Sequence, residues 1–313
     1  MNIAVIGMGG IGGYFGGKLS QLLNVHQEIN LFYIARGSHL DEIKKNGLEL
    51  EYNDKRIVCR PRLATDDFKA LPELDYILIS VKSYELENVL KQLKPLINSD
   101  TVMIPLLNGA DIHERVRKVI KTGIILPACV YIISFIEKPG KVKRTSASGV
   151  IHLGSENSEN KKEKAAAEGI LKLFDEAEIE YNWHEDPRVE IWRKFLFIAS
   201  FALVTADYNA TFGEVMESDE MSSMVKDIMS EIKTIADARN IDLPDDVCEK
   251  AHALGHKFAF DSTTSFQRDY RIQGKPDERD IFGAAIIRMG AEHAVSTSET
   301  EKIYRRIEKN KPL

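Results

Sequence analysis

The stretch that decides the fold is MNIAVIGMGGIGG, residues 1–13. Asn2–Ile6 is an apolar run typical of a buried strand, and the residues from Gly7 to Gly12 match the pattern GxGxxG. The residues from 11 to 23 then read as a helix. A strand, a glycine turn and a helix in this order are typical of the phosphate-binding corner of a dinucleotide-binding sheet.

Each glycine of the motif has its own physical purpose. Gly7 permits the tight turn out of the strand, Gly9 lets the backbone approach a pyrophosphate, and Gly12 lets the helix pack closely on the strand. The helix N-terminus adds N–H groups and a partial positive charge. We therefore expect the whole motif to contact the cofactor, through Gly7, Met8, Gly9, Gly10, Ile11 and Gly12.

Strands and helices alternate through the first half of the chain. Ser38 is expected to cap a helix that runs through Lys45, and Asn53-Asp54 to form the turn of a small hairpin. This order predicts an α/β fold, a mostly parallel, doubly wound Rossmann-type sheet with helices on both faces. The other expected strands are Asn30–Ile34, Tyr76–Val81, Val102–Leu107, Ile179–Trp183 and two weaker runs, Ile124–Phe135 and Val150–Leu153. The other expected helices lie near Glu85–Leu93 and Lys161–Ala177.

The pattern becomes helical after about residue 185. Pro187 stands at a plausible first helical position, and residues 261–265 and 272–276 read as loops. We therefore divide the chain into a nucleotide-binding Rossmann-like domain, residues 1–184, and an all-helical substrate and catalytic domain, residues 185–313. The expected helices of the second domain are 186–208, 218–240, 244–259, 277–295 and 298–310.

Composition excludes several classes of function. The 313 residues are 43% hydrophobic, which is ordinary for a globular protein of about two domains. The net charge of -6 disfavours nucleic acid and anionic membrane as partners. No apolar stretch reaches the roughly 20 residues of a membrane span, and no basic leader precedes the first strand. Three scattered cysteines predict neither a disulfide framework nor a metal site, so we expect a cytoplasmic protein.

The end of the second strand bears on the choice of cofactor. An NAD site usually has an acidic residue there for the ribose 2′-hydroxyl, whereas this chain has Arg36. A guanidinium binds a 2′-phosphate with its planar fork, so Arg36 predicts NADP(H). Lys82 and Asn108 end two further strands and are expected at the same cofactor crevice, where Asn108 would also reach the substrate.

Several motifs together resemble the ketopantoate reductase (2-dehydropantoate 2-reductase) family over nearly the whole chain. The resemblance rests on GMGGIGG at residues 7–13, Lys82, Asn108-Gly109, EIWRK at residues 190–194, FGE at residues 212–214, Ser265 with Asp269, and KPD at residues 275–277 before Gly283. It implies that NADPH reduces ketopantoate to pantoate, a step toward pantothenate and coenzyme A. It further implies that Lys194 is the catalytic acid, that Ser265 contacts substrate, and that Asp277 is the active-site carboxylate, with Glu278 as the alternative.

The sequence departs from the family pattern on the lysine helix. The family usually has asparagine four and eight residues after the lysine, on the same helical face, and here those positions are Ile198 and Ala202. Phe212 also stands where the family commonly has asparagine. Amides that bind substrate oxygens discriminate by roughly 10⁴–10⁵-fold, which apolar side chains do not. The reaction type is therefore better supported than the identity of the 2-oxo acid.

The chemistry expected of Lys194 follows from what ketone reduction needs. A nicotinamide delivers hydride to the carbonyl carbon, and an ammonium near the oxygen stabilises the alkoxide and donates a proton. Partial burial at the start of an apolar helix face would lower the pKa of Lys194 and make it a better acid. Asp277 would orient Lys194 or the substrate.

The sequence leaves three candidate functions open, together with the questions of metal binding and oligomeric state. The chain is either a ketopantoate reductase, a reductase of another ketone or 2-oxo acid, or a non-catalytic NADP(H)-binding sensor. His252 and His256 have the i, i+4 spacing of a metal pair without an evident third ligand, so we expect no metal. The helical half is compatible with a homodimer, although no interface motif stands out.

Overall fold

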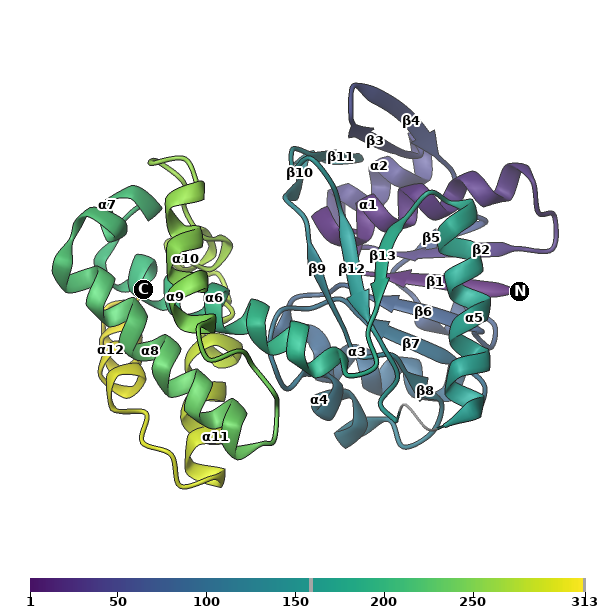
Figure 1. Cartoon of the computed structure of the whole chain (residues 1–313). Helices are drawn as coiled ribbons and strands as arrows, with labels where there is room; N and C mark the ends of the chain where they lie inside the picture. Colours follow the sequence, from purple (N-terminus) through teal and green to yellow (C-terminus); the bar gives the residue numbers. More distant parts are fainter. Residues whose placement is uncertain (158–159, 312–313) are drawn as a thin grey trace. The chain divides into compact units, whose positions relative to one another are not determined.

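The computed structural model describes residues 1–157 and 160–311 (Figure 1). It divides into two compact units, which are described separately below. The first comprises Met1–Leu107 and Ile112–Pro187, and the second comprises Asn108–Asp111 and Arg188–Leu313. The division therefore falls three residues after the expected boundary at 184, and the short segment after the fifth strand of the main sheet, Asn108–Asp111, belongs to the helical unit.

A parallel sheet forms the centre of the first unit. Within the described residues its strand order is β5-β2-β1-β6-β7-β8, and every neighbouring pair is parallel. This is the doubly wound order expected from the βαβ alternation, because strands are added on both sides of β1. The bounds are β1 Asn2–Ile6, β2 Asn30–Ile34, β5 Leu63–Thr65, β6 Tyr76–Ile79, β7 Val102–Pro105 and β8 Ile124–Ile125.

Helices and two smaller sheets cover the main sheet. One face shares a single core with α1, α5 and the inward side chains of the smaller sheets, including Phe15, Leu50, Val142, Ile151 and Ile170. The helices and turns of this unit are α1 Gly10–Leu19, η1 Ser20–Asn24, α2 Gly37–Asn46, η2 Phe68–Ala70, η3 Ser83–Glu85, α3 Leu86–Leu93, η4 Lys94–Leu96, α4 Ile112–Val119 and α5 Lys161–Glu176.

The smaller sheets account for the weak strand signals. The order β10-β11-β3-β4 forms one of them, and β13-β12-β9 forms the other. Asn53 and Asp54 both have positive φ, of 47° and 58°, as a tight hairpin turn between β3 and β4 requires. The bounds are β3 Leu48–Tyr52, β4 Lys55–Cys59, β9 Ala128–Tyr131, β10 Ser134–Lys138, β11 Lys141–Arg144, β12 Val150–Leu153 and β13 Glu180–Trp183.

Two expectations for the first unit were wrong in detail. Helix α2 begins at Gly37, with Arg36 at the N-cap, so Ser38 lies in the first turn and does not cap the helix. The hairpin of β10 and β11 was missed because its lysines hide the strand alternation. In the fold these charges are paired across strands, since Lys141 Nζ lies 2.8 Å from Glu51 and 2.7 Å from Glu137. These lysines hold the pKa of Glu51 at about 2, through hydrogen bonds from Lys141 and Lys143.

The second unit is helical, as expected. Its longest helix, α6, buries Trp192, Phe195 and Phe201 almost completely. Two short helices, α7 and α10, were missed. No described helix has the length and apolarity to cross a membrane. The bounds are α6 Pro187–Tyr208, α7 Phe212–Glu217, α8 Asp219–Ala238, α9 Val247–Leu254, η5 Gly255–Lys257, α10 Ser265–Tyr270, a π-type turn η6 Asp280–Ala284, α11 Ala285–Glu292 and α12 Ser298–Lys309.

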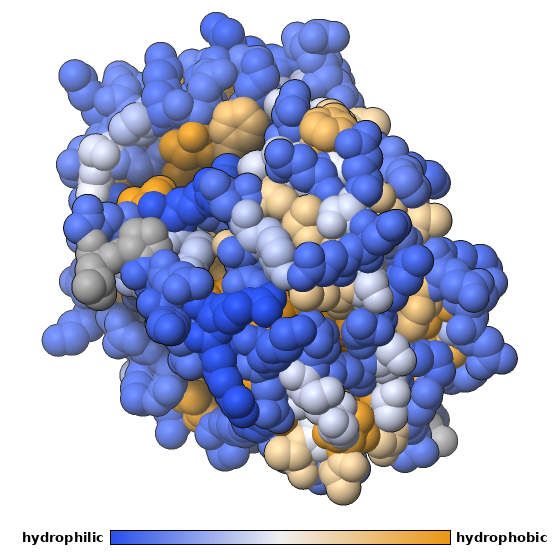
Figure 2. Space-filling model, turned by 90° about the vertical axis from the view of Figure 1, so that its left-hand side faces the viewer, coloured by the Kyte–Doolittle hydropathy of each residue, from blue (hydrophilic) through white to orange (hydrophobic). Residues whose placement is uncertain are grey.

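The surface seen in Figure 2 is mostly hydrophilic, and apolar residues reach it in separate patches. Exposed apolar side chains occur in both units, with Ile133 55% and Phe260 49% exposed. Scattered apolar residues are normal on a globular protein.

Candidate active site

The glycine motif lies between β1 and α1, and the packing of the fold explains three of its glycines. Gly7 has a φ of 91°. A Cβ atom on Gly12 would lie 2.0 Å from the carbonyl oxygen of Gly7, and one on Gly10 would lie 2.2 Å from that of Ser134. A side chain at any of these positions would therefore strain or separate the strand, the helix and the neighbouring hairpin.

Gly9 differs from these glycines, because a Cβ atom there would have no neighbouring atom within 4 Å. Its φ of -70° is ordinary for any residue, and it is the N-cap of α1 without a side-chain cap. Protein packing therefore does not require glycine at this position. Open space beside the uncapped N–H groups of a helix is what a pyrophosphate needs, so the loop fits a dinucleotide. Met8 is buried, which leaves its backbone as the part available to a ligand.

Arg36 follows β2 and occupies an exposed position. Its side chain is 71% exposed, and both terminal nitrogens donate to Oε1 of Glu85 at 3.1 Å. Such an exposed ion pair stabilises little, so the guanidinium is accessible to a phosphate. Lys82 directly precedes the short turn η3 that carries Glu85. The structure thus places Arg36 beside the loop that follows β6.

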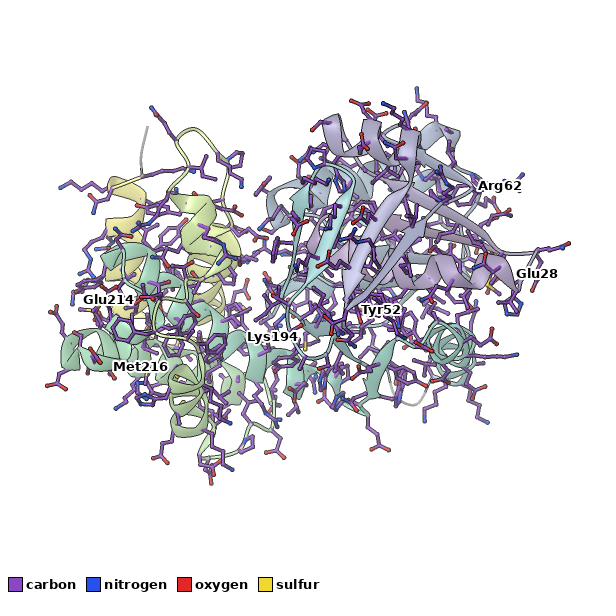
Figure 3. The ribbon with its side chains drawn as sticks, turned by 90° about the horizontal axis from the view of Figure 1, so that it is seen from above. Glu28, Tyr52, Arg62, Lys194, Glu214 and Met216 are labelled. Carbon is purple, nitrogen blue, oxygen red and sulfur yellow. The ribbon has the colours of Figure 1, made fainter. Side chains whose placement is uncertain are left out.

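Lys194 is brought to Asn108 within the second unit. Lys194, labelled in Figure 3, lies near the start of α6 and is 8% exposed. Its Nζ donates to Oδ1 of Asn108 at 2.8 Å. Asn108 begins the short segment Asn108–Asp111, and Asp111 at its other end is also held, because Arg288 donates to the buried Asp111 at 2.6 Å. The amide of Asn108 therefore orients a buried ammonium that would otherwise be costly to bury.

Asp277 has cationic partners other than Lys194. Arg279 donates to both carboxylate oxygens, at 2.9 and 2.7 Å, and Lys311 Nζ donates at 2.6 Å. Burial alone would raise the pKa of Asp277, but the hydrogen bonds from Arg279 and Lys311 and the charge of Arg279 outweigh it and hold the pKa at about 2. This geometry favours a structural role for Asp277. The adjacent Glu278 is also buried, at 5% exposure, and remains the alternative carboxylate.

The residues that replace the family amides pack inside the helical unit. Phe212 stacks on Phe258 at 4.4 Å between ring centroids and on Phe201 at 4.8 Å, so it is a core residue. Ile198, one helical turn after Lys194, is partly exposed. Ala202, two turns after Lys194, is 2% exposed. Ser265, the predicted substrate contact, is exposed and begins α10, whose N-cap is Thr264.

Of the two histidines at i, i+4 spacing, His252 of α9 has partners inside the fold. His252 Nε2 lies 2.8 Å from Oγ of Ser222, and its ring stacks on Phe201. Residues 1–157 and 160–311 contain no cluster of three or more histidine, cysteine and acidic side chains that could hold a metal ion.

These features define an oxidoreductase of the nicotinamide-dependent class, and comparison with known proteins gives its family. A model described as ketopantoate reductase PanE/ApbA matches residues 3–158, and the model of the C-terminal part of that family matches residues 186–311. The chain therefore belongs to the ketopantoate reductase family. This family consists of NADP-dependent oxidoreductases that act on CH–OH groups and reduce 2-oxo acids.

Individual relatives are distant but similar over their whole length. The chain is 25% identical over 304 residues to a Bacillus subtilis protein named uncharacterized oxidoreductase YkpB, covering 97% of each. It is 25% identical over 311 residues to the 2-dehydropantoate 2-reductase of Mesorhizobium japonicum, covering 93% of this chain and 91% of the relative. A crystal structure of a PanE/ApbA family ketopantoate reductase from Ralstonia eutropha has a TM-score of 0.86 at 21% identity, covering 99% and 98% of the two chains.

One further solved structure has the same fold and a different name. A ternary structure of D-mandelate dehydrogenase with NADH and anilino(oxo)acetate has a TM-score of 0.84 at 22% identity, and covers 99% of this chain and 98% of that one. The fold is thus found in proteins named for a 2-oxo acid, ketopantoate, and for a 2-hydroxy acid with a different side chain, mandelate, so it does not by itself identify the substrate.

Proposed function

We propose that this protein reduces 2-dehydropantoate to pantoate with NADPH, in the synthesis of pantothenate and coenzyme A. The observation that carries the proposal is the buried ammonium of Lys194, oriented by Asn108 at 2.8 Å, in a chain whose glycine motif has the open space of a dinucleotide loop at Gly9. The relatives named 2-dehydropantoate 2-reductase support the choice of substrate.

The chain's own residues would act on the carbonyl oxygen and on the cofactor. The bound nicotinamide supplies the hydride to the carbonyl carbon. Lys194 donates a proton from Nζ to the oxygen as negative charge develops there, and its amine is then reprotonated from water. Asn108 holds Nζ through Oδ1 and keeps its amide N–H₂ group as a donor toward substrate or cofactor. Arg36 would bind the 2′-phosphate, and Gly9 the pyrophosphate.

A second 2-oxo acid is the alternative substrate, and a specific observation favours it. Ile198, Ala202 and Phe212 offer no amide, and Phe212 is committed to the aromatic core. Of the three, only Ile198 is partly exposed, so an apolar side chain stands near Lys194 where the family has an amide, which suits a substrate whose side chain is apolar. Oxidation of NADPH with 2-dehydropantoate, 2-oxoisovalerate and phenylglyoxylate separates the two proposals. The highest kcat/KM with 2-dehydropantoate supports the first, and the highest with an apolar 2-oxo acid supports the second. Tight NADPH binding without turnover of any 2-oxo acid would contradict both.

Two glycine substitutions should have different effects. Gly9→Val should fold with unchanged thermal stability but bind NADPH at least about tenfold more weakly, because its side chain would fill the space proposed for the pyrophosphate. Gly12→Ala should unfold at a lower temperature, because its Cβ atom would clash with the oxygen of Gly7. Thermal unfolding and NADPH fluorescence titration measure the two effects. Normal NADPH affinity in Gly9→Val would exclude Gly9 from the pyrophosphate site.

Arg36→Asp should reverse the cofactor preference. A charge-assisted hydrogen bond to phosphate contributes about 1.5–3 kcal/mol, so the ratio of NADPH to NADH affinity should fall by about ten- to a hundredfold. Glu85→Gln is the matched control, since it removes the partner of Arg36 and leaves the guanidinium in place. That variant should retain or strengthen the NADPH preference. An unchanged ratio in Arg36→Asp would mean that another residue reads the 2′-phosphate.

A further inference from the structure

A cavity of about 390 Å³ lies in the first unit, on the side of α1 and apart from the glycine motif. Its lining comes from α1, the hairpin of β3 and β4, β11, and the segment from the end of α5 into β13. Tyr52, labelled in Figure 3, is one of its walls. The reaction proposed above uses none of the residues that line this cavity.

Two buried cations face the cavity. Lys18 is 3% exposed and Arg144 is 5% exposed. Lys18 Nζ lies 5.0 Å from the ring centroid of Tyr52, and the guanidinium carbon of Arg144 lies 5.1 Å from that of Tyr14. A buried charge is costly unless it is paired or fully hydrogen-bonded, so such a pair of cations calls for compensation.

The compensation within the protein is incomplete. In the described part of the chain, Lys18 Nζ has one hydrogen-bond acceptor, Glu178 at the long distance of 3.5 Å, and that carboxylate is 70% exposed. Burial lowers the pKa of Lys18, against the attraction of Glu178. Arg144 donates to Tyr14 at 2.9 Å, to Asn53 and to the carbonyl of Ala147, but its buried Nε has no acceptor among the described residues. The protein therefore leaves part of the hydrogen-bonding capacity of both cations unused.

The rim of the cavity has the opposite charge. Asp175, Glu178 and Glu180 line it from exposed positions, and Lys55 is the one exposed cation among the described lining residues. The six charged lining residues are three cations and three carboxylates, so the cavity is neutral overall but polarised. A simple anion would meet the carboxylates on its way in, and a simple cation would meet the buried ammonium and guanidinium.

From this layout we propose that the cavity is a second ligand site, which binds a small zwitterion. The carboxylate of the ligand accepts hydrogen bonds from Lys18 and Arg144 in the floor, and its ammonium pairs with Glu178 and Glu180 at the rim. A cavity of this volume is at the small end of ligand sites and suits a molecule of amino-acid size. The binding is reversible, and no bond is made or broken.

Calorimetric titration of the whole protein with glycine, 4-aminobutanoate and 6-aminohexanoate tests the proposal, because these probes differ in the distance between their charges. Acetate and ethylamine carry one charge each and serve as ligand controls. We expect at least one zwitterion to bind saturably, and at least about tenfold more tightly than acetate or ethylamine. Failure of all three zwitterions to bind would overturn the proposal, as would equal binding of acetate.

Substitutions then locate the binding. Lys18→Met should fold with unchanged or higher stability, because it replaces a poorly compensated buried charge by an apolar chain of similar length. It should weaken zwitterion binding by about ten- to a hundredfold, and Glu180→Gln by a smaller factor. Lys91→Met, at an exposed lysine of α3, is the matched control. Lys194→Ala should leave this binding intact. Unchanged binding in Lys18→Met, or its loss in Lys194→Ala, would show that the zwitterion binds elsewhere.

Discussion

Lys194→Ala is expected to lower kcat by about 10²- to 10⁴-fold, the usual contribution of a positioned general acid. The ammonium it removes is the proton donor for the developing alkoxide, and its neighbour Asn108 has no proton acidic enough to replace it. NADPH affinity should change little, because the glycine motif and Arg36 are untouched. Stopped-flow measurement of NADPH oxidation with saturating 2-oxo acid gives the rate of the chemical step directly.

Arg193→Ala is the matched control for Lys194→Ala. It removes a cation from the neighbouring position of α6, where Arg193 pairs with Glu190 at 2.8 Å and is 46% exposed. We expect its kcat to stay within a few-fold of the parent enzyme, because the proposed reaction gives Arg193 no part in protonating the substrate oxygen. Equal rates for Lys194→Ala and the parent enzyme would remove Lys194 from the reaction, while the family assignment would stand.

Asp277→Asn should lower the free energy of unfolding by about 3 kcal/mol, because it leaves Arg279 and Lys311 without their buried carboxylate. Urea unfolding at neutral pH measures this loss. The exposed neighbour Asp280 provides the control, and Asp280→Asn should change stability by about 0.5 kcal/mol or less. If Asp277→Asn instead abolished turnover at unchanged stability, the carboxylate would belong to the chemistry, as the family resemblance suggests.

The same carboxylate should make stability depend on acid pH. The pKa of Asp277 falls from 3.8 to about 2 on folding, which stabilises the folded state by about 2 kcal/mol above pH 4. Because the folded pKa is the lower one, this stabilisation is lost as the pH falls from about 4 to about 2. The difference in unfolding free energy between the parent protein and Asp277→Asn should shrink over that interval. A difference that stays constant down to pH 2 would contradict the ion pairing of Asp277.

Local sequence patterns predicted the nucleotide end of the molecule well. Asn2–Ile6 and Asn30–Ile34 are strands with the expected bounds, because a short apolar run ending at glycine or at polar residues has few alternatives. The Asn53-Asp54 turn was predicted because both side chains tolerate positive φ. The long helices of the second half were predicted from the helical spacing of their apolar residues. The short helix α7 was not, because the Thr211-x-x-Glu214 capping box at its start was overlooked.

Local sequence patterns could not predict which residues far apart in the chain pair with one another. Lys194 and Asn108 are 86 residues apart, and Lys311 and Asp277 are 34 apart, so nothing local indicates that they meet. The resemblance pointed to Asp277 as the active-site carboxylate, and only the fold revealed its two cationic partners. The β10–β11 hairpin was also missed for want of long-range information. Its lysines become compatible with a strand only beside Glu51 and Glu137.

The sequence by itself determined the strand, glycine turn and helix at the N-terminus, the change from alternating to helical structure, and the family. These depend on apolar period and on glycine sterics, which act over a few neighbouring residues. Only the tertiary structure decided which charges are compensated: Asn108 orients Lys194, Asp277 is paired with two cations, and the compensation of Lys18 and Arg144 is incomplete. Charge compensation depends on distance and burial in space, and a linear order of residues contains neither quantity.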